Sequence, residues 1–375
     1  LFPYTTLFRS KIIPKISNLS FDLRYISDMA MKTPDCLRSD LGELNYPVPE
    51  VIRQKLKELA DQQIFSYAPT FGDPDLLRAI RQFEEEKIKH FGSPAILVTS
   101  GGQAALFAAL NSLLMPGDAI LTDAIYYPPY ANLARIAEAE LINTSLETLD
   151  NARLSENIKV LLLNAPNNPT GKVYDQTTLV QLARLAREKD WIIIEDAVYS
   201  EIYFGEKPVS ITAYCPERTL VINSASKNFC MPGMRIGWIT GDESLISAIA
   251  KLHRNMNSCP NTLFQKVLAG FMPESTEYFS GLRIEMQKRR DAVMQLMDEL
   301  HWYYQKPAGG IYLMCRVPGL TDTLGYAEKL IKDHGISLMP GLFFGKSEDQ
   351  LRICFGALTM EEIAQFGKRL KYSLV

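Results

Sequence analysis

Seven short apolar runs recur between residues 95 and 239, separated by stretches with the period of a helix. The runs cover residues 95–99, 119–122, 141–142, 160–163, 191–194, 220–222 and 236–239. Most are apolar at every position, whereas a strand with one face in water alternates apolar and polar residues. The pattern therefore predicts an α/β fold with a mainly parallel seven-stranded sheet, flanked by helices that include residues 102–114 and 176–189.

The pattern of apolar positions changes after about residue 261. A long, strongly charged helix is predicted over residues 278–300, and sparser apolar runs follow at 307–314, 335–339 and 350–355. Sparse strands with a final helix are typical of a smaller α+β domain.

These patterns predict a large domain over residues 41–280 and a small C-terminal domain over residues 281–375. We expect residues 11–40 to form an N-terminal arm that joins the small domain. Residues 1–10 have no clear period and no initiator methionine, so we interpret them as a non-native tail and leave them out of the fold.

Charge favours a small molecule over nucleic acid or membrane as the binding partner, and the scattered cysteines favour a cytoplasmic setting. The 375 residues are 47% hydrophobic and 22% charged, which is ordinary for a globular chain. A net charge of -3, without a basic run, gives no attraction to nucleic acid or to an anionic membrane, and no apolar run is long enough to span a bilayer. The six cysteines and four histidines show no metal-binding spacing, so we expect reduced thiols and no metal site.

Polar and aromatic residues follow the predicted strands, where an open parallel sheet binds its ligands. In chain order they are Gly101, Gly102, Gln103, Tyr127, Asn168, Asp196, Tyr199, Ser224 and Lys227. Each has an ordinary interpretation as a turn or helix cap. Their recurrence at successive strand ends predicts one ligand site.

Lys227 gives this site its chemistry. A single lysine is far more often a solvated surface group, but this one follows an apolar run, so its amine is expected at a strand end. A partly desolvated lysine amine can form a Schiff base with a carbonyl. Arg235 and the helix start near Gly102 can both bind a phosphate. These residue types together suit an aldehyde cofactor that carries a phosphate.

Three motifs occur in a fixed order, namely Asn167-Asn168-Pro169-Thr170-Gly171, Asp196-Ala197-Val198-Tyr199, and Ser224-Ala225-Ser226-Lys227 with Arg235 eight residues further on. In these motifs and their separations the chain resembles the class I/II aminotransferases of the pyridoxal-phosphate-dependent fold-type I superfamily, which includes aspartate aminotransferase. The resemblance runs from about Leu41 to Phe355. Cys230 departs from the usual pattern, which has glycine, alanine or serine there.

The resemblance implies that pyridoxal 5'-phosphate is the cofactor and assigns catalytic roles. Lys227 would hold it as a Schiff base, the internal aldimine, and would shuttle the substrate proton. Asp196 would face the pyridine nitrogen, Tyr199 and Asn168 would bond to the phenolic oxygen, and Tyr127 would stack on the ring. The phosphate would be bound by Gly101, Gly102, Gln103, Ser224 and Arg235.

The resemblance also implies a substrate site and a partner subunit. Arg352 would clamp the α-carboxylate of the amino acid, with Asn168 beside it and Gly42 in the substrate-side loop. Tyr67 resembles the tyrosine that reaches the phosphate from the neighbouring subunit, which implies a homodimer with composite sites. Because Arg352 stands in an alternating run, a surface arginine on a strand is the alternative interpretation.

The expected reaction is transfer of an amino group from an L-amino acid to a 2-oxo acid. A β-eliminating lyase or related synthase on the same scaffold is the alternative, because no motif reports which Cα bond breaks. An effector-sensing domain of a transcriptional regulator is a third interpretation, but the segment before Leu41 is too short and too weakly basic for a DNA-binding module. The sequence does not predict the preferred substrate side chain.

Overall fold

The computed structural model describes residues 14–17, 19, 22–61, 66–92, 94–150, 154–345 and 347–373. The predicted tail, residues 1–10, and the first residues of the predicted arm lie outside the described residues.

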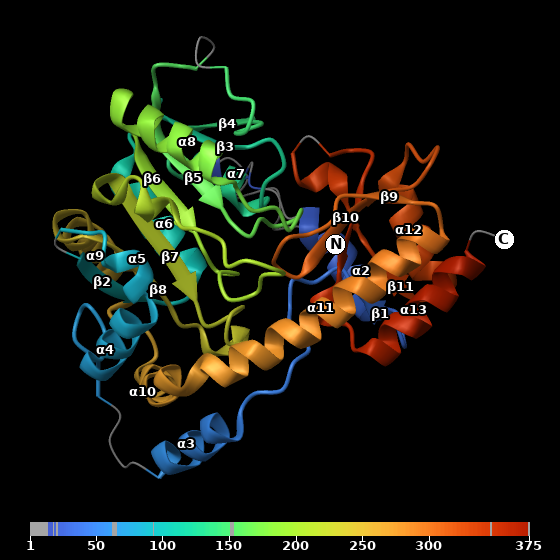
Figure 1. The fold of residues 1–375 in the computed structure, drawn as a ribbon, viewed down its shortest axis with the longest axis horizontal. Helices are drawn as coiled ribbons and strands as arrows, with labels where there is room; N and C mark the ends of the chain where they lie inside the picture. Colours follow the sequence, from blue (N-terminus) through green and yellow to red (C-terminus); the bar gives the residue numbers. More distant parts are fainter. Residues whose placement is uncertain are drawn as a thin grey trace, which may run out of the picture.

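A seven-stranded sheet forms the larger part of the molecule (Figure 1). Its order is β2 (Pro94–Thr99), β8 (Gly237–Asp242), β7 (Thr219–Ser224), β6 (Ile192–Asp196), β5 (Ile158–Asn164), β3 (Ala119–Asp123) and β4 (Glu140–Thr144). β8 runs antiparallel to β2 and β7, and the other neighbours pair in parallel. β7 is buried along its whole length, as its uniformly apolar start predicts. The predicted mainly parallel sheet of an α/β protein is confirmed.

Helices cover both faces of this sheet. Successive strand residues point to opposite sides, so uniformly apolar strands make both faces apolar. Leu162 of β5 packs with α6 (Gly102–Leu113), α7 (Pro129–Ile136) and α9 (Glu243–Asn257). Its neighbour Leu161 packs with α8 (Gln176–Glu188). Trp238 of β8 packs with three further helices, namely α3 (Glu50–Ala60), α4 (Pro74–Phe83) and α10 (Thr262–Phe271). The short α5 (Glu85–Ile88) follows α4.

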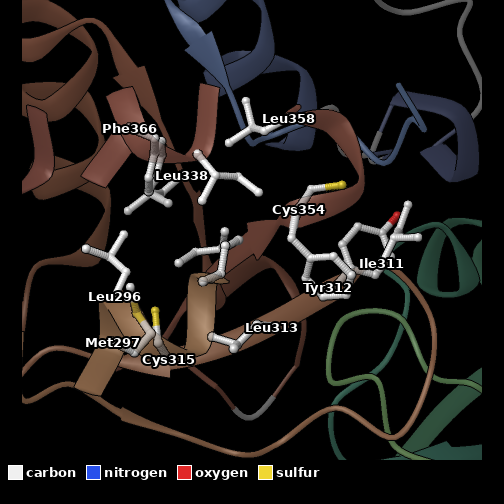
Figure 2. Packing of buried hydrophobic residues seen from close by; sticks show 14 of the residues in the cluster. Leu296, Met297, Ile311, Tyr312, Leu313, Cys315, Leu338, Cys354, Leu358 and Phe366 are labelled. Carbon is white, nitrogen blue, oxygen red and sulfur yellow. The ribbon is translucent and has the colours of Figure 1, made fainter. Parts of the chain in front are cut away.

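The smaller part is an antiparallel sheet with helices, as expected for an α+β unit. Its order is β12 (Met339–Pro340), β13 (Leu351–Cys354), β10 (Tyr312–Arg316) and β9 (Tyr303–Tyr304). Its helices are α11 (Ser275–Glu299), α12 (Thr323–His334) and α13 (Met360–Tyr372). Figure 2 shows its apolar core, in which Leu296 of α11, Leu313 of β10 and Phe366 of α13 belong to one cluster.

The N-terminal segment packs on this smaller part. After α1 (Pro14–Ser17), α2 (Asp22–Lys32) packs on α12 through Ile26, which shares a cluster with Ile331. β1 (Leu37–Arg38) pairs in parallel with β11 (Ile336–Ser337). The domain boundaries remain predictions, and the one after residue 280 falls inside α11, which runs from beside α10 towards β9 (Figure 1). Among the described residues no helix is long and apolar enough to cross a bilayer.

Candidate active site

A cavity of about 440 Å³ lies beyond the carboxyl ends of β5, β6 and β7, where Asn164, Asp196 and Ser224 line it. The arm and the smaller part close its other side, through residues such as Arg24 and Arg352. The predicted site residues that line it are Gly42, Gly102, Gln103, Tyr127, Asn168, Asp196, Tyr199, Ser224, Lys227, Arg235 and Arg352. The structure thus brings together almost every residue that the sequence singles out.

Gly101 and Tyr67 are the two exceptions. Gly101 lies directly behind the cavity wall, since a Cβ on it would be 2.4 Å from Nη2 of Arg235. Tyr67 does not line the cavity, and 86% of its surface is exposed. Its role across a subunit interface therefore stays a prediction.

Lys227 stands in the turn that follows β7, and its amine faces the cavity. Its Nζ donates a hydrogen bond to the carbonyl oxygen of Gly42. Burial lowers the pKa of the Lys227 amine, and the positive charges of Arg352 and Arg235 add to this effect, while Cys354 and Glu43 oppose it. A larger share of this amine is therefore neutral and nucleophilic than in an ordinary lysine.

Asp196 is the last residue of β6 and is only 4% exposed. Its Oδ2 accepts a hydrogen bond of 2.6 Å from the hydroxyl of Tyr130. Its Oδ1 is buried and has no hydrogen-bond partner among the described residues. Burial raises the pKa of Asp196 to about 6, although the Tyr130 bond acts in the opposite direction. A buried carboxylate oxygen without a donor, in the wall of a cavity, fits the protonated ring nitrogen of a ligand.

Donors for a phosphate gather at the start of α6. Gly101 precedes this helix with a φ of 88°, and no side chain of the described residues caps the helix start. The N–H groups of Gly102 and Gln103 are therefore available to an anion, which the helix dipole favours, whereas the N–H of Gly101 donates to the carbonyl oxygen of Thr99 at 2.8 Å. Arg235 lies against the same loop, where its Nη2 donates to the carbonyl of Ser100 at 3.3 Å. Ser224 also lines the cavity, and its hydroxyl donates to the carbonyl oxygen of Ile236 at 3.3 Å.

Arg352 of β13 reaches the cavity from the smaller part. It is 3% exposed, so the alternative of a surface arginine is wrong. Its Nη1 donates to Oδ1 of Asn168 at 3.0 Å, its Nη2 donates to the backbone oxygen of Asp40, and its Nε has no partner among the described residues. The guanidinium lies 4.4 Å from the ring centre of Tyr312. A planar cation with a free N–H at a cavity wall suits a carboxylate.

Four further residues shape the site, and the sequence reasoning assigned them no role. Tyr130 binds Asp196, and Tyr312 meets the hydroxyl of Tyr199 at 2.8 Å. Asn164 donates to the backbone oxygen of Asp196 at 2.9 Å and accepts from the N–H of Asn168 at 2.7 Å, while Asp40 accepts from Arg352. Asn164 is the last residue of β5, and Tyr130 lies in α7, which follows β3, so the strand ends were a usable signal for both. Tyr312 and Asp40 are brought in by distant segments.

Comparison with known proteins identifies the family. The sequence model described as "Aminotransferase class I and II" matches residues 37–370. The chain is 30% identical to the aspartate/prephenate aminotransferase of Thermus thermophilus over 344 residues, which cover 85% of this chain and 89% of that protein. It is 29% identical over 339 residues to a probable aspartate aminotransferase of Methanocaldococcus jannaschii, covering 87% and 89% of the two chains.

Solved structures agree with these relatives. The aspartate aminotransferase of Thermus thermophilus with maleate superposes with a TM-score of 0.88 at 25% identity, covering 96% of this chain and 99% of that one. The match spans both parts of the fold and the cavity between them. This chain therefore belongs to the class I and II aminotransferases and is a pyridoxal-phosphate-dependent transaminase.

Proposed function

We propose that the enzyme transfers the amino group of an L-amino acid to a 2-oxo acid in this cavity, with Lys227 as the lysine that binds the cofactor. The observation that supports this assignment is the shared wall of the cavity. A partly buried lysine with a lowered amine pKa and Asp196, whose Oδ1 has no partner among the described residues, line the same cavity. Among ordinary cofactors, pyridoxal 5'-phosphate uses both an amine partner and an acid partner.

Different residues of the cavity would bind different parts of the cofactor. Bound pyridoxal 5'-phosphate supplies an electron sink for the charge that develops at the substrate Cα. Asp196 would keep a proton on the ring nitrogen, and Tyr127 would lie against the ring face. Asn168 and Tyr199 would bond to the phenolic oxygen. The phosphate would take the N–H groups at the start of α6, with Ser224 and Arg235, which neutralise its charge.

Arg352 would orient the substrate, and Lys227 would move its proton. The guanidinium already faces Asn168, and its free Nε offers a further donor for the α-carboxylate. With the carboxylate fixed, the Lys227 amine would accept the Cα proton as a general base and would then hold it as a general acid. Because burial lowers the pKa of this amine, it holds fewer protons at neutral pH and is available as a base.

A half-reaction tests this proposal directly. The protein loaded with pyridoxal 5'-phosphate is mixed with one amino acid, without an acceptor. We expect one equivalent of 2-oxo acid and one of the cofactor's amine form, and borohydride reduction before mixing should attach the cofactor to Lys227. Release of ammonia with no amine form would support the β-eliminating lyase instead.

We also propose a homodimer in which Tyr67 contributes to the neighbouring site. The support is that Tyr67 is largely exposed and does not line the cavity of its own chain. Tyr67→Phe and Lys227→Ala proteins would be mixed under mild denaturation and refolded. If Tyr67 acts across the interface, the mixed dimer regains one intact site and activity returns. If Tyr67 acts within its own subunit, no mixture exceeds the activity of Tyr67→Phe alone.

We propose a cytoplasmic location as well. All six cysteines are free thiols, including the buried Cys315 and Cys354, which a reducing compartment would preserve. Fractionation of the source cells with an antibody to the protein would test this location.

A further inference from the structure

A buried polar network lies behind the turn that carries Lys227. It consists of Glu84, Asn223 and Asn228, whose exposures are 1%, 0% and 0%. None of the three lines the cavity. Buried amide and carboxylate groups lower stability unless they are hydrogen-bonded, so a network of this kind has to be satisfied by specific partners.

The network closes the turn from both ends. Asn223 Oδ1 accepts hydrogen bonds from the N–H of Ser224 at 2.8 Å and from Nδ2 of Asn228 at 2.9 Å. Ser224 is the last residue of β7, just before the turn, and Asn228 is the residue after Lys227. The backbone that carries the lysine is therefore flanked on both sides by residues that bond to the same oxygen atom of Asn223.

The same side chains tie the turn to the rest of the site. Asn228 Oδ1 accepts from the N–H of Glu201 at 3.1 Å, which belongs to the segment that follows Asp196 and Tyr199. On the other side, Asn223 Nδ2 donates to Oε1 of Glu84 at 2.9 Å.

Glu84 anchors the network in the fold. The oxygen that binds Asn223 also accepts from the indole N–H of Trp238 at 3.0 Å. The other carboxylate oxygen pairs with Lys87 at 2.6 Å. Every polar atom that the network directs inward thus has a partner.

We propose that the Glu84–Asn223–Asn228 network is a positioning device that fixes the Lys227 amine relative to Asp196 and keeps it withdrawn from water. This inference rests on the proposed role of Lys227. The three residues act only through Lys227, without touching substrate or cofactor. A loosened turn would leave the fold intact and would displace the amine, and a displacement of about 1 Å can reduce an enzyme's rate about 100-fold.

Asn228→Leu tests the proposal, because leucine has a similar size and removes both polar atoms. The first readout is the pKa of the Lys227 amine in the apoprotein, from competitive acylation at several pH values with mass spectrometry. We expect this pKa to rise towards that of an exposed lysine. In the holoenzyme we expect the single-turnover rate to fall at least tenfold.

Gln265→Leu is the matched control. Gln265 is 0% exposed, accepts from the N–H of Asp73 at 2.7 Å and donates to Pro260 at 3.0 Å, but lies outside the cavity wall. The Gln265→Leu protein should lose stability as the Asn228→Leu protein does, but its lysine pKa and its single-turnover rate should stay unchanged. If the two variants change the lysine pKa and the single-turnover rate equally, or if neither variant changes them, the proposal is wrong.

A charge substitution gives a second test. Asn223→Asp sets a buried carboxylate against Glu84 and should displace the turn, so the single-turnover rate of the holoenzyme should fall at least tenfold. An Asn223→Asp protein with the wild-type rate would overturn the proposal. A wild-type holoenzyme whose cofactor is not attached to Lys227 would overturn the proposed function, whereas the apoprotein readout would still report on the network.

Discussion

Replacing Asp196 with asparagine should stabilise the apoprotein while it abolishes transamination. The wild-type carboxylate is 4% exposed, and one of its oxygens has no partner among the described residues. Burial raises its pKa from 3.8 to about 6. This gap corresponds to about 3 kcal/mol, at 1.36 kcal/mol per pKa unit. Asparagine has the same shape and can still accept the hydrogen bond from Tyr130.

The sign of this effect depends on pH. Because the pKa of Asp196 is raised in the folded protein, its contribution to stability is fully present below about pH 4 and is lost as the pH rises through 6. Above pH 6 the ionised carboxylate of Asp196 lowers the free energy of unfolding by about 3 kcal/mol. Asparagine carries no charge and has no such cost. The variant should therefore be about 3 kcal/mol more stable than wild type at pH 8, and this advantage should fall to about half at pH 5.

Urea unfolding of the two apoproteins between pH 5 and 8 measures this difference. Asp123→Asn serves as the control, since Asp123 is also buried but pairs with Lys172 at 2.9 Å. Removing that charge should destabilise the protein. Equal stability of wild type and Asp196→Asn at pH 8, or a difference that does not vary with pH, would refute the assignment of Asp196 as an unpaired buried acid.

Three further predictions concern single positions. Lys227→Ala should abolish the visible absorption of the lysine-bound cofactor without changing the far-ultraviolet circular dichroism, and a bond that borohydride still reduces would mean that another lysine holds it. Arg352→Ala should weaken the binding of α-carboxylate substrates by about 2–5 kcal/mol and the binding of the corresponding amines far less. Equal losses of binding would contradict the proposed role of Arg352 as the carboxylate clamp. Gly101→Ala should weaken cofactor binding, because φ is 88° and the new Cβ would lie 2.4 Å from Arg235. Gly233→Ala is the control and should leave cofactor affinity unchanged, because no atom lies within 4 Å of the new Cβ. Equal affinity in both variants would contradict a phosphate site at the start of α6.

The sequence predicted the sheet and eleven of the residues that line the cavity, because both depend on local pattern. Buried parallel strands are apolar throughout, and the residues just after them meet at one edge. The antiparallel direction of β8 could not be predicted, since an apolar run has the same pattern in either direction. The contact of Tyr312 with Tyr199 joins positions 113 residues apart, so no local signal reports it. The burial of Arg352 likewise depends on the docking of the smaller part.

The hydrogen bonds of Arg352 link three separate segments of the chain. β13 supplies the guanidinium, the loop after β5 supplies Asn168, and the arm supplies the backbone oxygen of Asp40. If Arg352 binds the α-carboxylate as we propose, the carboxylate would compete with these internal acceptors, and part of its binding free energy would be spent on displacing them. Substrates and products would then be held less tightly than the cation alone would hold them, which would favour rapid exchange of one amino acid for the next oxo acid.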